Sequence, residues 1–311
     1  MHRVFVSGPT GCIGAATVAY LLDSGVSEVI GFSRNQDLSR IPERYHERLT
    51  CIPGDISDAS TVRQSLQNSR PTHIIHLAAY QTPDCQAYPF QGLDVNVTGT
   101  INMLRAAAEL DGELQRFVFA SSAAVYGARD LYETETVGET SPYQPPNLYG
   151  YWKVAGEGMA QAFHRETGVA TVALRLATTY GPGRDRGLTS APTSAIKSVA
   201  RGIAYQMPYQ GREHYHYVAD VGAGFAQAAV APFSGYGVFN LRGRTIEVID
   251  FLTTVQQAAH NAGLDRVPEL SIAADAASMP FVCDLDDRAI LAAFPDMPLT
   301  SVEEGVRRSL R

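Results

Sequence analysis

The sequence predicts an α/β fold, and three observations carry this prediction. Apolar, strand-like runs alternate with helix-like segments through the first half of the chain. A glycine-rich turn at residues 7–14 joins the first run to the first helix. Beyond Gly181 the alternation becomes irregular. Strands that alternate with helices form parallel sheets with right-handed crossovers. We therefore expect a Rossmann-type, doubly wound parallel sheet, followed by a smaller mixed α/β lobe that binds substrate.

The first half supplies six strands and the helices between them. Each predicted strand is a short apolar run: Val4–Val6, Val29–Phe32, Leu49–Pro53, His73–Leu77, Phe117–Ala120 and Thr171–Leu176. The helices are predicted where good helix formers follow a capping residue or a turn: Ala15–Leu22, Thr61–Leu66, Leu93–Leu110 and Leu148–His164. Asn147 is the expected N-cap of the last helix, and Gly168 is expected to end it.

The rest of the chain is less regular. The acidic, proline-rich segment Tyr126–Pro146 is predicted to be a loop over the site. Later elements are a strand at Glu213–Ala219 and helices at Ser194–Gly202, Val221–Val230, Thr245–His260 and Asp286–Phe294. We expect a dinucleotide domain at residues 1–177 and a substrate lobe at 178–311. The boundary is approximate because the chain is expected to cross between them, and the site is expected in the cleft.

Net charge, apolar run length and cysteine content limit the classes of function and the location that we expect. A net charge of −7 gives no electrostatic footprint for nucleic acid. No apolar run approaches the roughly 20 residues that span a bilayer, so no membrane partner is expected. The first predicted strand begins close to Met1, which leaves no room for a signal peptide. Four scattered cysteines suggest free thiols, so we expect a cytoplasmic protein.

The glycine-rich turn has the chemistry of a dinucleotide pyrophosphate site. Gly8 permits a sharp turn, Gly11 lets the backbone approach phosphates, and Gly14 lets the helix pack on the strand. The free N–H groups of the helix N-terminus would face the anion. A structural turn is the alternative interpretation.

Three side chains could perform proton and hydride chemistry. Tyr149 and Lys153 are four residues apart, so they share a face of a helix. An ammonium nearby and a positive nicotinamide ring would both favour the phenolate, which predicts Tyr149 as the acid or base. Ser122 follows the fifth strand, at the edge where ligands bind in open α/β sheets. Its hydroxyl could hold the reacting oxygen.

Together these motifs resemble the extended short-chain dehydrogenase/reductase family, the NAD(P)-dependent epimerase/dehydratase group. The resemblance runs through Gly54-Asp55, His76-Leu77-Ala78-Ala79, Asn96-Val97-Thr98-Gly99-Thr100 and Tyr180-Gly181-Pro182-Gly183. It implies Tyr149, Lys153 and Ser122 as catalytic residues. The cofactor contacts that we expect are Gly8, Thr10, Gly11, Cys12, Ile13, Gly14, Ser33, Arg34, Asp55, Ile56, Leu77, Ala78, Ala79, Ala120, Tyr149 and Lys153. The expected substrate contacts are Tyr80, Ser122, Ala123, Thr178 and Arg184.

Departures from the family pattern bear on cofactor and substrate. Ser33-Arg34 replaces the acidic residue that usually holds the NAD ribose, which favours NADP over NAD. Ala123 and Ala124 replace the acid–base pair of sugar 4,6-dehydratases, so that elimination is not expected.

Further departures concern the lobe. Glu213 stands where the family has a phosphate-binding arginine, although Arg212 could substitute if the register slips. These changes argue against an ordinary nucleotide-sugar as the substrate.

Two other features of the sequence concern Trp152 and a pair of histidines. Trp152 replaces a small residue, and two interpretations are open: it packs at a dimer seam, or it narrows a pocket. His214 and His216 could bind zinc, but no third ligand is evident, and no metal is expected.

The resemblance leaves three functions to weigh. The leading hypothesis is an NAD(P)-dependent oxidoreductase that moves hydride to or from a hydroxyl or keto carbon of a carbohydrate-like small molecule. The alternative is a redox-neutral sugar or nucleotide-sugar epimerase with the same residues. A non-catalytic dinucleotide-sensing protein is the third. The resemblance also implies a homodimer, formed through the predicted helices Leu93–Leu110 and Leu148–His164.

Overall fold

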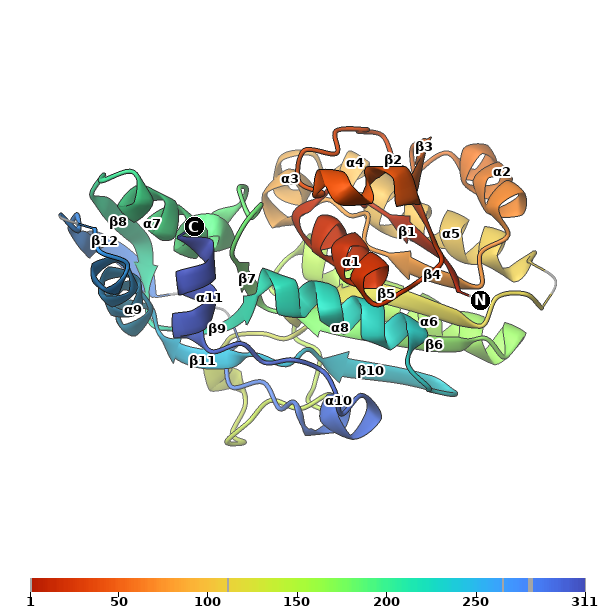
Figure 1. The fold of residues 1–311 in the computed structure, drawn as a ribbon. Coiled ribbons are helices and arrows are strands. Elements are labelled where there is room, and N and C mark those ends of the chain that lie inside the picture. The colour runs from red at the N-terminus through yellow and green to blue at the C-terminus, as the bar shows by residue number, and fades with distance from the viewer. Residues whose placement is uncertain (1, 111, 265, 279–281, 311) are drawn as a thin grey trace.

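A seven-stranded parallel sheet is the centre of the fold. The computed structural model describes residues 2–110, 112–264, 266–278 and 282–310. The strand order is β10-β6-β5-β4-β1-β2-β3, and every neighbouring pair is parallel (Figure 1). Its strands are β1 Arg3–Ser7, β2 Glu28–Ser33, β3 Leu49–Pro53, β4 His73–His76, β5 Arg116–Ser122, β6 Ala170–Leu176 and β10 Tyr236–Asn240. The order reverses between β1 and β4, which is where ligands bind in doubly wound sheets.

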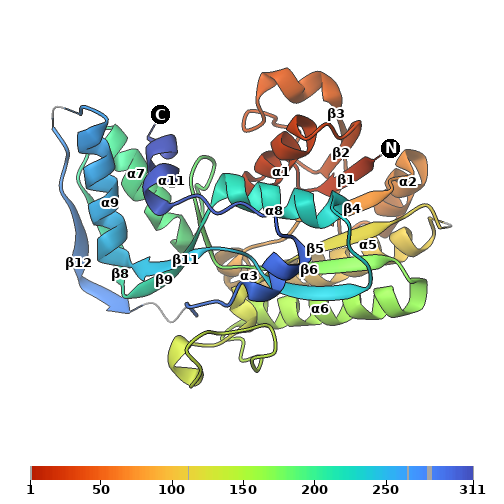
Figure 2. The same ribbon diagram turned by 60° about the horizontal axis from the view of Figure 1, so that its bottom comes forward.

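Helices cover both faces of this sheet. On one face α1 (Cys12–Asp23) runs beside α8 (Val218–Val230), and on the other lie α2 (Ala59–Ser69), α5 (Gly99–Ala108) and α6 (Leu148–Thr167) (Figures 1 and 2). The side chains of alternate residues in a strand therefore pack into two different hydrophobic cores, one on each face of the sheet. Val4 and Val6 pack under α1 and α8, whereas Phe5 packs on the α2 and α5 side.

A smaller lobe lies beyond the C-terminal ends of the strands (Figure 2). It contains a three-stranded sheet of β11 (Arg244–Glu247), β9 (Arg212–Tyr217) and β7 (Thr178–Tyr180), and a parallel pair of β12 (Leu270–Ser278) and β8 (Tyr205–Gln210). The helices α7 (Ala191–Ala200), α9 (Val248–Asn261) and α11 (Val302–Ser309) belong to the same lobe. Its core is aromatic: the Tyr215 and Phe251 rings stack with their centroids 4.7 Å apart.

The six strands predicted in the first half are present, and the caps of α6 agree with the sequence. The Asn147 side chain accepts a hydrogen bond from the Gly150 N–H at 3.1 Å. Gly168 ends the helix with a left-handed φ of 72°. Several elements were not predicted: β7, β8, β10, β11, β12, α11 and the short helices α3 Thr82–Ala87 and α4 Pro89–Leu93. Most of these strands are short, and β10 returns to the large sheet beside β6.

Two predicted helices need correction. The segment Leu93–Leu110 is not one α-helix, because a π-helical turn at Asp94–Thr98 separates α4 from α5. The prediction Thr245–His260 began too early, since residues 244–247 pair with β9 and the helix begins at Val248. No helix in the described ranges is both long and apolar enough to cross a bilayer.

Candidate active site

The glycine turn leaves the start of α1 open to an anion. Gly11 is the N-cap, and no side chain caps this helix. Gly8 has a φ of +74°, and a Cβ on Gly14 would lie 2.0 Å from the Gly8 carbonyl oxygen. The tight turn and the close packing of helix on strand therefore both require glycine. Unpaired N–H donors at an uncapped helix start fit the pyrophosphate of a dinucleotide.

The residues expected around the adenosine end lie at the carboxyl ends of β2 and β3. Arg34 Nη1 is 3.3 Å from the Tyr80 hydroxyl and 3.7 Å from Asp55 Oδ2. The Arg34 side chain is 56% exposed, so it is free to meet a ligand. Ile56, in contrast, is packed in the core on the α2 and α5 side. Its side chain takes part in helix packing.

A buried hydrogen-bond chain fixes the end of β4 beside the glycine turn. Ser7 Oγ accepts from the N–H groups of Leu77 and Ala78 at 3.1 Å and lies 2.7 Å from His76 Nδ1. His76 Nε2 lies 3.1 Å from Thr100 Oγ1. Burial lowers the pKa of His76 to about 3, and the nearby Lys153 charge adds to the shift. His76 is therefore a neutral spacer that positions the 77–80 segment.

The π-helical turn at Asp94–Thr98 also holds the 77–80 segment in place. Asn96 lies in this turn, and its side chain accepts from the Tyr80 N–H at 2.7 Å and donates to the Tyr80 carbonyl at 3.0 Å. An extra residue in a helix commonly marks a functional position. Here it places the amide of Asn96 against the backbone that follows β4.

A cavity of about 430 Å³ opens at the C-terminal ends of the strands, between the sheet and the smaller lobe. It collects these sequence-predicted residues: Ile13, Leu77, Ala79, Ala120, Ser122, Ala123, Tyr149, Lys153, Thr178 and Arg184. The other predicted cofactor residues lie outside this lining, as does Tyr80. Glu213, which the sequence analysis placed at a phosphate-binding position, also lines the cavity. Sequence reasoning missed Gln81 and Thr189 as cavity residues. They come from loops, where no motif marks them.

The three predicted catalytic residues meet at this cavity. Lys153 Nζ lies 5.4 Å from the centre of the Tyr149 ring and donates to the Ala120 carbonyl at 2.6 Å. The Ser122 hydroxyl lies close enough to the Tyr149 phenol to lower the pKa of that phenol. Burial lowers the pKa of the Lys153 ammonium to about 8. The Tyr149 phenol, the Lys153 ammonium and the Ser122 hydroxyl therefore lie together at the carboxyl end of β5.

The predicted acidity of Tyr149 needs correction. Burial raises the pKa of Tyr149 to about 12, while the hydrogen bond from Ser122 and the Arg184 charge act in the opposite direction. The expectation that Lys153 makes the phenol acidic underestimated desolvation, which disfavours any buried anion. The protein groups by themselves therefore keep Tyr149 protonated at neutral pH.

A buried ion pair behind the catalytic residues was not foreseen. Glu157 follows Lys153 by one helical turn of α6, and Arg175 from β6 binds its carboxylate through Nε and Nη2, each at 2.8 Å. Both side chains are at most 2% exposed. The Ser121 and Tyr143 hydroxyls donate to the same carboxylate at 2.5 and 2.7 Å. This cluster ties α6, β5 and the 126–146 loop together.

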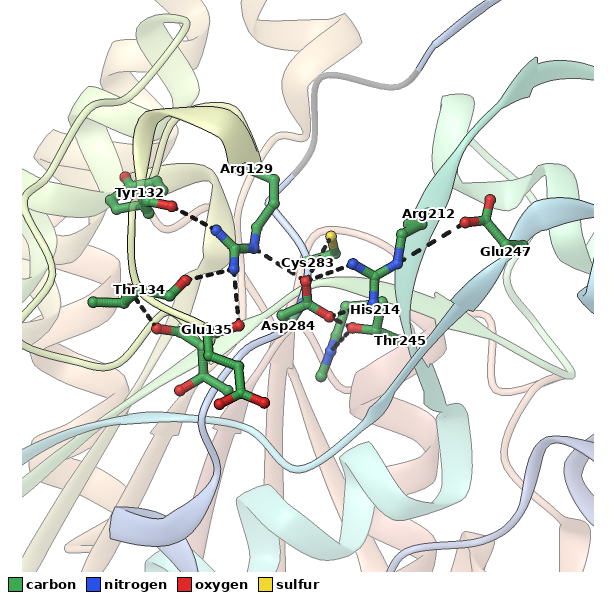
Figure 3. A network of polar contacts seen from close by, with 11 residues as sticks. Arg129, Tyr132, Thr134, Glu135, Arg212, His214, Thr245, Glu247, Cys283 and Asp284 are labelled. Carbon is green, nitrogen blue, oxygen red and sulfur yellow. Dashed lines mark hydrogen bonds and ion pairs between the residues drawn. The ribbon is translucent and has the colours of Figure 1, made fainter.

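The lobe side of the cavity carries a carboxylate. Glu213 is 1% exposed and accepts from the Thr178 hydroxyl at 2.5 Å and the Tyr209 hydroxyl at 3.0 Å. Burial raises its pKa. The suggestion that Arg212 could replace a phosphate-binding arginine is wrong for this structure. Arg212 donates to both oxygens of Asp284, at 2.8 and 2.7 Å, and does not line the cavity (Figure 3).

Trp152, whose place was left open, packs inside the protein. It is 9% exposed and does not line the cavity. A Cβ on Gly92 would lie 2.6 Å from Trp152 Cζ3, so α4 can sit on α6 only because residue 92 is glycine. His214 and His216 are buried, and within the described ranges no three or more His, Cys, Asp or Glu residues gather as a metal site.

The model of the NAD-dependent epimerase/dehydratase family matches residues 4–241. The chain belongs to this family. The match covers the glycine turn, the Ser122, Tyr149 and Lys153 positions and the first strands of the lobe. The resemblance to extended short-chain dehydrogenases/reductases is thereby confirmed, as is the doubly wound parallel sheet.

Similar proteins include family members of known name. UDP-glucuronate 4-epimerase 5 of Arabidopsis thaliana is 31% identical over 58% of this chain and 42% of its own length. A probable dTDP-glucose 4,6-dehydratase of Sinorhizobium fredii is 28% identical over 58% and 54%. The crystal structure of Thermus thermophilus UDP-glucose 4-epimerase with NAD is 26% identical, with a TM-score of 0.82 over 99% of this chain and 97% of that one. The matched stretch spans about half or less of these two curated relatives.

Proposed function

We propose that this protein moves hydride between a nicotinamide dinucleotide and a hydroxyl or keto carbon of a carbohydrate-like small molecule. The observation that carries this proposal is the convergence of Tyr149, Lys153 and Ser122 on one cavity. The dinucleotide, when bound, supplies or accepts the hydride. The uncapped start of α1 would hold its pyrophosphate, and Lys153 would hold the ribose next to the nicotinamide.

The chain's own groups would manage the proton. In the direction of oxidation, Tyr149 takes the proton of the substrate hydroxyl as hydride leaves the same carbon, and in reduction it returns the proton. Ser122 donates a hydrogen bond to the reacting oxygen and stabilises the charge that develops there. Since burial raises the pKa of Tyr149 to about 12, the cationic Lys153 and a positively charged nicotinamide are both needed to make it a base.

A redox-neutral epimerase is the second candidate, because several similar proteins are named as sugar-nucleotide 4-epimerases. It would oxidise a sugar carbon, turn the ketone over and reduce its other face with the same residues. The two candidates differ in a simple measurement. A dehydrogenase changes the absorbance of the reduced dinucleotide during turnover, whereas an epimerase converts its sugar with no net change.

Substitution of Tyr149 by phenylalanine tests this site. The Tyr149→Phe protein is expected to lose about a hundredfold or more in kcat, because general acid–base catalysis contributes that much. The substrate is first found by thermal shift with NAD, NADP and a panel of free sugars, sugar acids and nucleotide-sugars, since bound ligand stabilises the folded state.

The neighbouring Tyr151→Phe variant is the matched control for this test. Its side chain is 59% exposed on the same helix, so its activity should stay within twofold of wild type, roughly. Full activity in Tyr149→Phe would contradict the enzymatic proposal. A biological role that persists in Tyr149→Phe would instead favour the dinucleotide-sensing alternative.

We further propose NADP as the preferred dinucleotide. The residue at the end of β2 is Ser33 and not an acidic residue, and the exposed Arg34 follows it. A guanidinium can bind a 2′-phosphate through two hydrogen bonds. The solved relative named above holds NAD, so the choice needs a direct measurement.

Calorimetry with both dinucleotides measures that choice. Arg34→Ala is expected to weaken NADP about tenfold or more and NAD much less, because only NADP carries the 2′-phosphate. Ser33→Asp should reverse the preference toward NAD. Equal losses for the two dinucleotides in Arg34→Ala would mean that Arg34 contacts the adenine alone.

We also propose that two copies pair as a homodimer at the seam expected for Leu93–Leu110 and Leu148–His164, extended to the adjacent α4. Phe90 is 83% exposed, and Tyr88 and Tyr151 are each 59% exposed. These side chains lie on or beside α4 and α6, which pack against each other. Exposed aromatic clusters of this kind are typical of interfaces between proteins.

The four cysteines are unpaired, which fits a reducing compartment, and we propose the cytoplasm as the location of the protein.

A further inference from the structure

Three charged side chains line the cavity without an ion-pair partner among the described residues: Lys153, which the proposed mechanism uses, and Arg184 and Glu213, which it does not. Arg184 donates to the Gln81 side chain at 3.0 Å and to the Thr189 hydroxyl, and its Nε is buried without any hydrogen-bond partner. Glu213 accepts from the hydroxyls of Thr178 and Tyr209, and the Tyr215 phenol lies close enough to lower the pKa of this carboxyl. Buried charges in proteins are nearly always paired. A ligand is the natural partner for both.

Arg184 lies where it can reach the reacting end of the cavity and also the lobe side. Its charge lowers the pKa of the Tyr149 phenol and of Tyr209, the residue that donates to Glu213. Gln81 and Thr189, which fix its guanidinium, are cavity residues themselves. The cation is thus anchored by neutral groups and keeps its charge available for an anion.

The lobe side is unsuited to a diphosphate. Glu213 stands at the position where the family resemblance placed a phosphate-binding arginine, and its carboxylate would repel a phosphate group. Arg212 cannot compensate, because Asp284 binds its guanidinium outside the cavity (Figure 3). The Glu213 oxygens already accept from the hydroxyls of Thr178 and Tyr209, so they are suited to further hydroxyl donors.

We propose that the substrate is a free polyhydroxy acid that carries no diphosphate. Its carboxylate binds Arg184, and one or more of its hydroxyls bind Glu213. Guanidinium and carboxylate form two parallel hydrogen bonds, which gives both affinity and orientation. This substrate class rests on the proposed function, in which Tyr149 faces the carbon that reacts.

Calorimetry on the protein saturated with its dinucleotide tests the proposal. The probes are D-glucuronate, D-galacturonate, D-glucose, D-glucosamine and UDP-glucuronate, so that the acid, the amine and the nucleotide vary one at a time. A uronate is expected to bind tightest. Arg184→Gln should weaken that uronate about tenfold or more and leave D-glucose within about twofold.

Further variants separate this effect from folding. Arg184→Lys keeps the positive charge and should retain part of the uronate affinity. Arg186→Gln, at an exposed position two residues along the same loop, should leave all probes unchanged. Glu213→Arg should improve UDP-glucuronate relative to the free uronate, because it restores a cation on the lobe side.

Several results would overturn the proposal: no uronate binding, tighter binding of UDP-glucuronate or D-glucosamine, or an Arg184→Gln variant that weakens the dinucleotide as strongly as the uronate. The last result would make Arg184 a cofactor contact. Failure of the proposed function looks different. A protein that binds no dinucleotide at all contradicts the function, whereas one that binds dinucleotide and prefers UDP-glucuronate contradicts only the substrate class.

Discussion

The charge of Lys153 is opposed by its surroundings. Lys153 is 4% exposed, and among the described residues its ammonium donates to the Ala120 carbonyl alone, at 2.6 Å. Burial lowers its pKa from 10.5 to about 8. The same ammonium is the cation that would help Tyr149 lose its proton. A group kept in an unfavourable state inside a cavity is typical of a functional site.

This shift predicts how stability depends on pH. Below about pH 8 the lysine is protonated in the folded and unfolded states, and the full penalty of a buried ammonium is present. Between about pH 8 and 10.5 the unfolded chain binds more protons, so the free energy of unfolding rises with pH. Across this pH window the free energy of unfolding of wild type, measured relative to that of Lys153→Met, should rise by about 3 kcal/mol. Urea unfolding at a series of pH values measures the difference.

A matched substitution controls for general effects of losing a lysine. Lys197 is 44% exposed and pairs with Asp185 at the surface. Lys197→Met should therefore change the free energy of unfolding by less than about 1 kcal/mol. A constant difference between wild type and Lys153→Met would show that the Lys153 ammonium is not desolvated.

At the scale of elements, the Glu157–Arg175 pair holds α6 in place beside β5 and β6. Four donors converge on the Glu157 carboxylate: two guanidinium nitrogens and the hydroxyls of Ser121 and Tyr143. Tyr149, Lys153 and Glu157 follow each other at four-residue steps on the helix. The pair therefore sets the rotation of the helix that carries the proposed catalytic residues.

Removal of this carboxylate is expected to be strongly destabilising. Glu157→Gln leaves a buried guanidinium without its counter-charge, and such changes lower the free energy of unfolding by about 3–5 kcal/mol. The same substitution at Glu109, which pairs with Arg63 on the exposed surface, should change it by less than about 1 kcal/mol. Denaturant unfolding of the two variants compares them directly, and equal effects would contradict the role assigned to the pair.

At the scale of the whole molecule, exposed aromatic side chains gather around α4. Gly92 lets α4 sit directly on Trp152, and this contact presents Phe90 to solvent. A side chain that is 83% exposed buries almost nothing in the monomer. A second copy of the chain would remove it from water.

The dimer proposal predicts a change in molecular mass. Wild type should elute as a dimer at micromolar concentration in size-exclusion chromatography with light scattering. Phe90→Asp should shift it to a monomer, because a charge at the centre of an apolar interface is costly. Ile203→Asp is the control, since Ile203 is 56% exposed in the smaller lobe and should not affect the mass. A wild-type monomer would refute the proposal.

The local patterns of the sequence were enough for the first half of the fold and for the proposed catalytic residues. A strand, a glycine turn and a helix follow each other in the chain, and Tyr149 and Lys153 share a helix face, so short-range geometry sets these features. The short strands of the lobe and the return of β10 to the large sheet were missed. Their partners are distant in sequence, and pairing alone makes them strands.

Only the tertiary structure decided what the cavity contains and how its groups ionise. Gln81 and Thr189 line it although no motif marks them, and folding brings them beside Arg184 and Glu213, which the sequence had singled out. Residue spacing correctly placed Lys153 near Tyr149, but it did not show that burial opposes the phenolate. The reason is physical: spacing along a helix fixes which side chains are neighbours, whereas ionisation depends on how much water the whole fold removes from around them.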